Sequence, residues 1–259
     1  MAASSIMNPR LSVRGLSKRY GETPVLTDLD FVASPGETVA IIGRSGSGKT
    51  TLLRCLTLLD LPDRGDAYLD DQQYLASGVP LYEPWEIRRS IVLVFQDFNL
   101  FPNMTVLRNI ALALEKSRGM SRREAQDRAE DSARLLGIGD VLDQYPFSLS
   151  GGQAQRCALA RAMVLEPQVF LLDEITSALD PETVVNVVEA MRALRKADKS
   201  GRMAMIVVTH LMHFAEDFAD RISFLHNGRI HEELPAKEFF RNCKEPETQK
   251  FIGAFVNRL

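Results

Sequence analysis

One segment of the chain carries the residues of a phosphate-binding loop. Residues 43–50 read Gly-Arg-Ser-Gly-Ser-Gly-Lys-Thr, which matches the pattern G-x-x-x-x-G-K-[ST]. In such a loop the glycines let backbone N–H groups converge on phosphate oxygens, the lysine reaches the β and γ phosphates, and the threonine hydroxyl can ligate Mg²⁺. An apolar run precedes the loop and a helix-like segment, 51–59, follows it, and this context argues against the alternative of a glycine-rich turn with an exposed lysine. The residues expected to bind a nucleotide here are Gly43, Arg44, Ser45, Gly46, Ser47, Gly48, Lys49, Thr50 and Thr51.

A pair of carboxylates forms the second candidate group. Asp173 and Glu174 come directly after the apolar run 169–172. Asp173 is expected to hold Mg²⁺ together with Thr50, and Glu174 to polarise an attacking water. An acidic pair after a strand is common and by itself would be an ordinary strand end. Combined with the phosphate loop, the pair predicts hydrolysis of a nucleotide.

These groups need elements that bring them together. Four apolar runs, at residues 38–42, 90–95, 169–172 and 203–208, lack the alternation of half-exposed strands. Helix-length segments separate them, so the pattern predicts an α/β fold whose mostly parallel sheet is covered on both faces. The runs end at the phosphate loop, Gln96, the acidic pair and His210. Because functional groups gather at the carboxyl ends of parallel strands, the four groups are expected to share one crevice.

The rest of the chain predicts a helical lobe, an N-terminal strand and a late hairpin. Residues 97–165 are helical in pattern, with turn signals at 101–102, 137–139 and 145–146. Capping residues predict helices after Ser121 and after Asp180. Residues 11–18 alternate loosely, as an antiparallel edge strand does, and Asn227-Gly228 predicts a hairpin turn. The stretch 71–86 is predicted to be a loop, and we assign it no function.

Composition limits the class of protein. The chain has 259 residues, 45% of them hydrophobic and 25% charged, which is ordinary for a globular protein, and a formal net charge of −3 gives no basic field for nucleic acid. The three cysteines, Cys55, Cys157 and Cys243, lack metal-ligand spacing and are expected to be buried or neutral thiols in a reducing compartment. No secretory pattern and no apolar run of about 18 residues is present. We therefore expect a cytoplasmic protein that reaches a membrane only through another chain.

A third motif indicates the family. Residues 149–153 read Leu-Ser-Gly-Gly-Gln, and with them the sequence resembles the ATP-binding cassette (ABC) ATPases, which have a P-loop NTPase (RecA-like) core. From the residues alone, Ser150 and Gln153 predict a capping box at a helix N-terminus that can bind an anion. In the family, the motif that Ser150, Gly151, Gly152 and Gln153 match contacts the γ-phosphate of ATP held by the opposite subunit. The resemblance thus implies ATP and Mg²⁺ as cofactors and a homodimer, or a dimer with a homologous ATPase.

The resemblance assigns four more positions. Tyr20 is similar to the aromatic residue that stacks on adenine, although by itself it would be an exposed tyrosine at a strand end. Gln96 is similar to the glutamine that senses Mg²⁺ and the γ-phosphate, and His210 to the switch histidine, although a histidine that ends a strand is usually structural. Residues 177–180, Ser-Ala-Leu-Asp, are similar to the loop that crosses the dimer interface, where Asp180 also has a structural role as an N-cap.

The resemblance covers nearly the whole chain. It implies a single ABC ATPase domain over residues 1–259, with residues 1–96 and 166–259 as the nucleotide-binding core and residues 97–165 as the inserted lobe. Two positions depart from the family. Ile175 stands where a proline is usual, and Leu211 where a glutamate commonly follows the histidine. Neither change removes a reacting group, but isoleucine does not fix the backbone as proline does.

The branch of the family is indicated by residues 95–110, which are similar to ATPases of polar amino-acid importers. This resemblance implies an ATP-hydrolysing subunit on the inner face of the plasma membrane that powers uptake of an amino acid through a separate permease. An extracytoplasmic solute-binding protein is then an indirect partner. One alternative is an ABC ATPase that acts on DNA or ribosomes, but such proteins usually carry coiled-coil insertions or two fused cassettes. Another is a cassette that binds ATP without hydrolysis, against which Lys49, Asp173, Glu174 and His210 argue.

Overall fold

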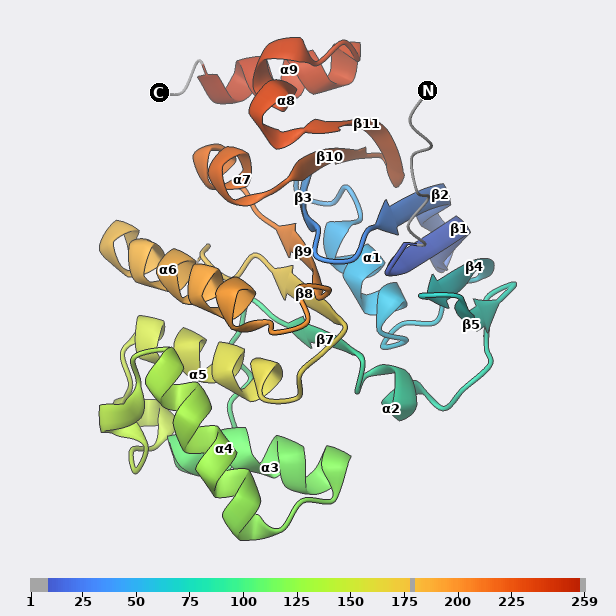
Figure 1. Cartoon of the computed structure of the whole chain (residues 1–259). Coiled ribbons are helices and arrows are strands. Elements are labelled where there is room, and N and C mark those ends of the chain that lie inside the picture. The colour runs from blue at the N-terminus through green and yellow to red at the C-terminus, as the bar shows by residue number, and fades with distance from the viewer. Residues whose placement is uncertain (1–8, 178–179, 257–259) are drawn as a thin grey trace, which may run out of the picture. The chain divides into compact units, whose positions relative to one another are not determined.

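The computed structural model describes residues 9–177 and 180–256 (Figure 1). The chain divides into two compact units. The first contains the chain up to Ile91, then Gln168–Asp173, and the chain from Arg202 onward. The second contains Val92–Pro167 and Glu174–Gly201.

An antiparallel sheet forms the N-terminal part of the first unit. Its strands are β1 (Leu11–Tyr20), β2 (Thr23–Ala33), β4 (Arg64–Leu69), β5 (Gln72–Ala76) and β6 (Val79–Pro80), in the order β2-β1-β4-β5-β6. Because β1 pairs with both β2 and β4, it is an interior strand, and the prediction of an edge strand at residues 11–18 was wrong. The alternation shows only that one face of β1 is covered. Interior strands and edge strands of an antiparallel sheet both have this pattern, so the pattern does not tell them apart.

The second sheet carries the buried apolar runs. Within the first unit its strands are β3 (Thr38–Ile42), β8 (Val169–Asp173), β9 (Ala204–Val208), β10 (Arg221–His226) and β11 (Arg229–Pro235). They lie in the order β11-β10-β3-β9-β8. The pairs β10–β3, β3–β9 and β8–β9 are parallel, and every residue of β3, β8 and β9 is buried, which confirms the predicted sheet. β10 and β11 form the predicted hairpin around Asn227-Gly228.

Three helices cover this sheet near β10. They are α7 (Met212–Phe218), α8 (Ala236–Asn242) and α9 (Pro246–Val256), which lie beside β10 and β11 (Figure 1). Ala215, Phe239 and Phe251 of these helices pack against apolar residues of β3 and β10, among them Ile42 and Phe224. Burial of large apolar side chains is the main force that holds the helices to the sheet.

The helix α1 (Lys49–Leu56) begins inside the phosphate loop, as the motif requires. It ends before residue 59, where the sequence predicted its end. Leu58 has a left-handed backbone with φ 54°, and the N–H groups of Leu59 and Asp60 both donate to the carbonyl of Arg54. The chain therefore turns sharply at the end of α1.

The predicted loop at residues 71–86 was wrong. It contains β5, β6 and the short helix α2 (Pro84–Ile87). A local signal was present, because Glu83 and Glu86 form a capping box with Pro84 at the first helical position. The strand β5 is held by a contact that local sequence does not show. Its Tyr74 is fully buried, and the Tyr74 hydroxyl donates to the carbonyl of Leu56 at 3.0 Å.

The second unit is mainly helical. It contains α3 (Val106–Arg118), α4 (Arg122–Leu135), α5 (Gly151–Met163), α6 (Pro181–Ala197) and the 3₁₀ turns η1 (Gly139–Val141) and η2 (Pro146–Ser148), and α5 packs against α3, α4 and α6. Ser121 and Glu124 form the predicted capping box. The strand β7 (Ile91–Val94) leads into this unit. Its residues Val92 and Leu93 were predicted to be covered on both faces, but they are half-buried because they line a pocket.

Among residues 9–177 and 180–256, no helix combines the length and the apolar character needed to cross a membrane.

Candidate active site

The phosphate loop links β3 to α1 and depends on two glycines. A Cβ at Gly43 would lie 2.2 Å from the carbonyl oxygen of Leu225, and a Cβ at Gly48 would lie 2.9 Å from the carbonyl oxygen of Val25. Gly48 also has a left-handed φ of 107°. The N–H of Gly228, in the β10–β11 hairpin, donates to the carbonyl of Ser47 at 3.1 Å. The hairpin and β2 thus hold the loop in a shape that only glycine allows.

Two polar groups in this loop suit a bound phosphate. Lys49 is 5% exposed, and its Nζ donates to the carbonyls of Gly43 at 3.0 Å and Arg44 at 3.1 Å, so the ammonium group lies across the loop. The Ser47 hydroxyl is buried and has no hydrogen-bond partner among the described residues. A buried donor without a partner costs free energy, which a bound phosphate oxygen would recover. The loop therefore fits the phosphates of a nucleotide.

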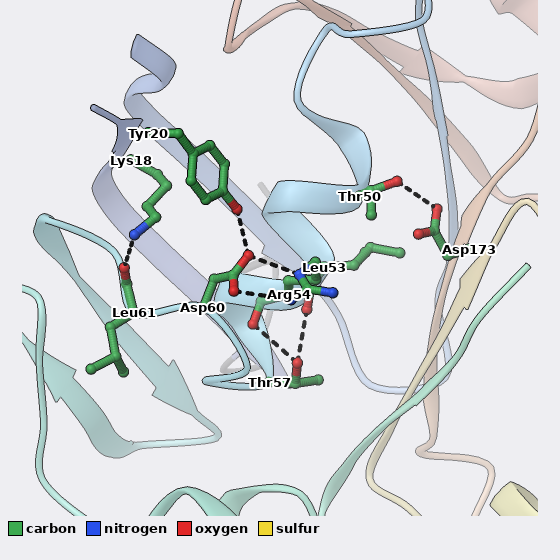
Figure 2. Close-up of polar contacts among 9 residues, drawn as sticks. All are labelled: Lys18, Tyr20, Thr50, Leu53, Arg54, Thr57, Asp60, Leu61 and Asp173. Carbon is green, nitrogen blue, oxygen red and sulfur yellow. Dashed lines mark hydrogen bonds and ion pairs between the residues drawn. The ribbon is translucent and has the colours of Figure 1, made fainter. Parts of the chain in front are cut away.

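A hydroxyl and a carboxylate lie together beside the loop. Thr50 Oγ1, in the first turn of α1, donates to Oδ1 of Asp173 at 3.2 Å (Figure 2). Asp173 ends β8 and is 5% exposed. Both groups offer hard oxygen ligands, the kind that Mg²⁺ prefers next to substrate phosphates. Their contact confirms that the phosphate loop and the predicted carboxylate meet, and the pair fits a magnesium ion.

Three of the four expected groups follow neighbouring strand ends. In the register of the sheet, Ile41 of β3 pairs with Val208 of β9, and Val208 pairs with Asp173 of β8. The phosphate loop, His210 and Asp173 therefore leave the sheet at the same edge, as predicted. The turn before α7 is held by Thr209, whose buried hydroxyl accepts from the N–H of Leu211 at 3.0 Å.

Glu174 and Gln96 belong to the second unit. Glu174 is half-buried and has a left-handed φ of 48°, which is uncommon for glutamate. Its carbonyl accepts hydrogen bonds from the N–H of Ser177 at 3.0 Å and from the Ser177 hydroxyl at 2.8 Å. Such local backbone strain is found preferentially at functional sites. Gln96 is exposed and follows β7 directly.

The Leu-Ser-Gly-Gly-Gln motif opens α5. The Ser150 hydroxyl accepts from the N–H of Gln153 at 3.3 Å, and the Gln153 side chain accepts from the N–H of Ser150 at 2.9 Å, which confirms the capping box. Gly152 lies close to α6: a Cβ there would be 2.6 Å from Cγ2 of Thr183. Gly151 is exposed, so the helix N-terminus has an open side.

The segment that resembles an interface loop is only partly described. Asp180 caps α6 as predicted, because its carboxylate accepts from the N–H of Thr183 at 2.9 Å and from the Thr183 hydroxyl at 2.6 Å. Ala178 and Leu179 lie outside the described residues.

Tyr20 ends β1 with its ring 49% exposed, as expected of a residue that offers a stacking surface. Its hydroxyl donates to the carboxylate of Asp60, which also accepts from Arg54 (Figure 2). Sequence reasoning missed Arg54 and Asp60. An arginine in the last turn of a helix is a weak signal, and nothing local links either residue to a tyrosine on a distant strand.

The cysteines have the character expected of neutral thiols. Burial raises the pKa of both Cys55 and Cys157 to about 12. Cys243 is half-buried, and burial raises its pKa as well. Since all three thiols are disfavoured as thiolates, nucleophilic cysteine chemistry has no place at this site.

Known proteins match this sequence and fold. The model of the family ABC transporter matches residues 26–177. The chain is 43% identical to the glutamine transport ATP-binding protein GlnQ of Geobacillus stearothermophilus, over 93% of this chain and 97% of that protein. It is 42% identical to the arginine transport ATP-binding protein ArtM of Bacillus subtilis (strain 168), over 93% and 98%. A solved dimeric structure of the ATP-binding cassette MJ0796 bound to ADP and phosphate has a TM-score of 0.76 and 33% identity, and covers 87% of this chain and 98% of its own. The chain therefore belongs to the ABC transporter ATP-binding proteins.

Proposed function

We propose that this chain is the ATP-hydrolysing subunit of an importer for a polar amino acid. The observation that carries the proposal is the contact between Thr50, at the phosphate loop, and the buried Asp173, because it joins a phosphate site to a magnesium site. The relatives named for glutamine and arginine transport match nearly the full length of the chain, and this supports an amino acid as the solute.

Each predicted residue has a role in this reaction. The loop backbone, Ser47 and Lys49 bind the phosphates, and Thr50 and Asp173, with Gln96, hold Mg²⁺. The ion, when bound, neutralises phosphate charge. Glu174 orients and polarises the attacking water, as a general base does. His210 contacts the γ-phosphate, and Tyr20 stacks on adenine. The loop residues Gly43, Arg44, Ser45, Gly46, Gly48 and Thr51 complete the nucleotide site.

A second subunit completes the site. The N-terminus of α5 carries a partial positive charge and is capped by Ser150, so it suits the γ-phosphate of a nucleotide on the partner. Each chain holds one phosphate loop and one such helix, so a head-to-tail dimer, of this chain or with a homologous ATPase, uses both. Gly151, Gly152, Gln153 and Asp180 then lie at the interface.

The helical lobe, residues 97–165, couples this dimer to the permease. The second unit contains a pocket of about 450 Å³, whose lining includes Val92, Phe95, Phe101, Leu112 and Arg161. Arg161 shapes the segment 96–101: it donates to the carbonyls of Asn99 at 2.7 Å and Phe98 at 3.1 Å, and its guanidinium lies over the Phe101 ring. An apolar pocket with an exposed phenylalanine suits an amphipathic helix. We assign it to a cytoplasmic helix of the permease, which places the chain on the inner face of the membrane.

The experiment that tests the function is purification of the native complex. The membrane subunit and the solute-binding protein are identified by mass spectrometry, and uptake of each amino acid is measured in proteoliposomes with internal ATP. A polar amino acid should enter only with ATP. Copurification with ribosomes or DNA and no membrane subunit would refute the proposal.

The docking segment is tested in the same assay. Replacing Phe98 and Phe101 with serine should weaken permease association and abolish uptake while ATP binding persists. Phe101→Ser alone should disturb folding less than the double variant, because the Phe101 side chain is already 45% exposed. The matched control is Leu135→Ser on α4, since Leu135 is also 45% exposed. Normal uptake by the double variant, or its unfolding, would show that these rings do not form the docking surface.

A further inference from the structure

A polar cluster supports Tyr20 from outside the phosphate loop. It consists of Lys18 and Tyr20 on β1, Arg54 in the last turn of α1, and Asp60 in the turn that follows (Figure 2). All four residues lie in the first unit. The phosphate loop therefore lies at the N-terminal end of α1, and the residue that binds the Tyr20 hydroxyl, Asp60, lies in the turn after its C-terminal end.

The carboxylate of Asp60 anchors the ring through its hydroxyl. Tyr20 Oη donates to Oδ2 of Asp60, and Arg54 binds the same carboxylate through both oxygens, Nε to Oδ2 at 2.8 Å and Nη2 to Oδ1 at 3.1 Å. The Arg54 hydrogen bond is the main cause that lowers the pKa of Asp60. Burial, followed by the bond to Asp60, raises the pKa of Tyr20. At neutral pH, Asp60 is thus a charged acceptor and Tyr20 a protonated donor.

Lys18 covers one face of the same ring. Its ammonium lies 5.2 Å from the ring centroid, in a cation–π contact, and also donates to the carbonyl of Leu61 at 2.7 Å. The hydroxyl is held by Asp60 and Lys18 contacts the ring, yet Tyr20 remains 49% exposed, which leaves ring surface for a base to stack on.

The turn after α1 fixes the position of Asp60. The left-handed Leu58 reverses the chain, and the N–H groups of Leu59, at 2.9 Å, and Asp60, at 3.3 Å, donate to the carbonyl of Arg54. The side chain of Asp60 then returns to the guanidinium of the same arginine. The Asp60 side chain is 17% exposed and that of Arg54 is 40% exposed, so the carboxylate is the better shielded partner of the pair.

We propose that Asp60, held by Arg54, is a positioning residue for Tyr20 and strengthens the base-dependent part of ATP binding. The inference rests on the proposed function, in which Tyr20 stacks on adenine. A ring that is already ordered loses less conformational entropy when a base stacks on it. Removing the anchor should therefore weaken ATP binding about five- to tenfold, the effect of freeing one such side chain.

The test compares ATP with inorganic tripolyphosphate, which has no base. Dissociation constants of the complete chain are measured by calorimetry, with EDTA present to prevent hydrolysis. Asp60→Ala should raise the Kd for ATP about five- to tenfold and leave the Kd for tripolyphosphate unchanged. Tyr20→Phe keeps the ring and the Arg54–Asp60 pair but loses the hydroxyl, which Thr51 also contacts, so it should weaken ATP binding at least as much even if Asp60→Ala does not fold. The Asp60→Ala/Tyr20→Phe double variant should bind ATP no more weakly than Tyr20→Phe alone.

The matched control is Asp70→Ala. Asp70 also binds an arginine through both oxygens, Arg10 at 2.8 and 2.6 Å, and forms a longer ion pair with Arg202 at 3.9 Å. It lies in the same unit, so its loss should leave both dissociation constants unchanged. If Asp60→Ala and Tyr20→Phe weaken neither ligand, or both ligands equally, Asp60 does not position the ring. If the unaltered chain binds ATP no more tightly than tripolyphosphate, the stacking role of Tyr20 itself is wrong.

Discussion

Thr50 Oγ1 donates a hydrogen bond to Oδ1 of Asp173 at 3.2 Å, across 123 positions of the chain. Thr50 lies in the first turn of α1 and Asp173 ends β8, so the contact exists only when the parallel sheet has formed. It brings together two hard oxygen atoms of the kind that Mg²⁺ binds next to phosphates.

Thr50→Val keeps the shape of this side chain and removes its hydroxyl. The Mg²⁺ concentration for half-maximal ATP hydrolysis should rise about 10- to 100-fold, the usual range when a metal-site partner is lost. Thr50→Ser retains the hydroxyl and should behave as the unaltered chain. A magnesium titration of phosphate release measures both, and an unchanged Mg²⁺ requirement in Thr50→Val would remove Thr50 from the metal site.

Glu174→Gln should bind ATP but hydrolyse it about 10² to 10⁴ times more slowly, because the amide cannot accept a proton from water. Phosphate release and equilibrium binding of a fluorescent ATP analogue separate the two effects. Lys49→Ala should instead weaken binding, since it removes the ammonium that lies across the loop. Normal turnover by Glu174→Gln would exclude it as the base.

Glu174→Gln should also dimerise when Mg-ATP is added, which light scattering after size exclusion detects. Adding Ser150→Arg places a long cation where the γ-phosphate must approach the N-terminus of α5, so it should prevent the dimer. Nucleotide binding by the monomer should remain, and this is the control. A dimer that persists in the double variant would mean that α5 does not contact the partner's nucleotide.

Gly152→Ala should destabilise the packing of α5 on α6, because its Cβ would lie 2.6 Å from Cγ2 of Thr183. Overpacking of this kind costs about 1–3 kcal/mol. Thr183→Ser removes Cγ2 and keeps the hydroxyl that donates to Asp180, so in that background Gly152→Ala should be nearly neutral. Urea unfolding of the nucleotide-free protein measures the coupling. Equal losses in both backgrounds would disprove the steric explanation.

The buried thiols should make the stability of the folded protein depend on pH. Burial raises the pKa of Cys55 and Cys157 to about 12, above the ordinary value of about 8.5 in an unfolded chain. Their contribution to stability is therefore complete below about pH 8.5 and is lost as the pH rises toward 12. At pH 8, iodoacetamide should modify Cys243 first and the other two only after unfolding, as mass spectrometry can follow. Equally fast labelling of Cys55 would contradict its burial.

Local sequence signals were enough to predict several helix caps, the phosphate loop and the buried strands. The caps at Ser121, Ser150 and Asp180 each need only the next few residues, and all three were predictable because the hydrogen bonds stay within one helical turn. The phosphate loop is contiguous, and the apolar runs of β3, β8 and β9 show burial on both faces directly.

Only the tertiary structure decided which distant groups meet. The alternation in β1 shows a covered face but not that β2 and β4 flank it, because the side-chain pattern of one strand does not specify which other strands pair with it. The contact between Tyr20 and Asp60 depends on the reversal at Leu58 and on the sheet that places the end of β1 there. Gly152 could be identified as part of a motif, but its need to lack a Cβ comes from Thr183 on another helix. Such contacts are set by packing in three dimensions, which the order of residues along the chain specifies only through the whole fold.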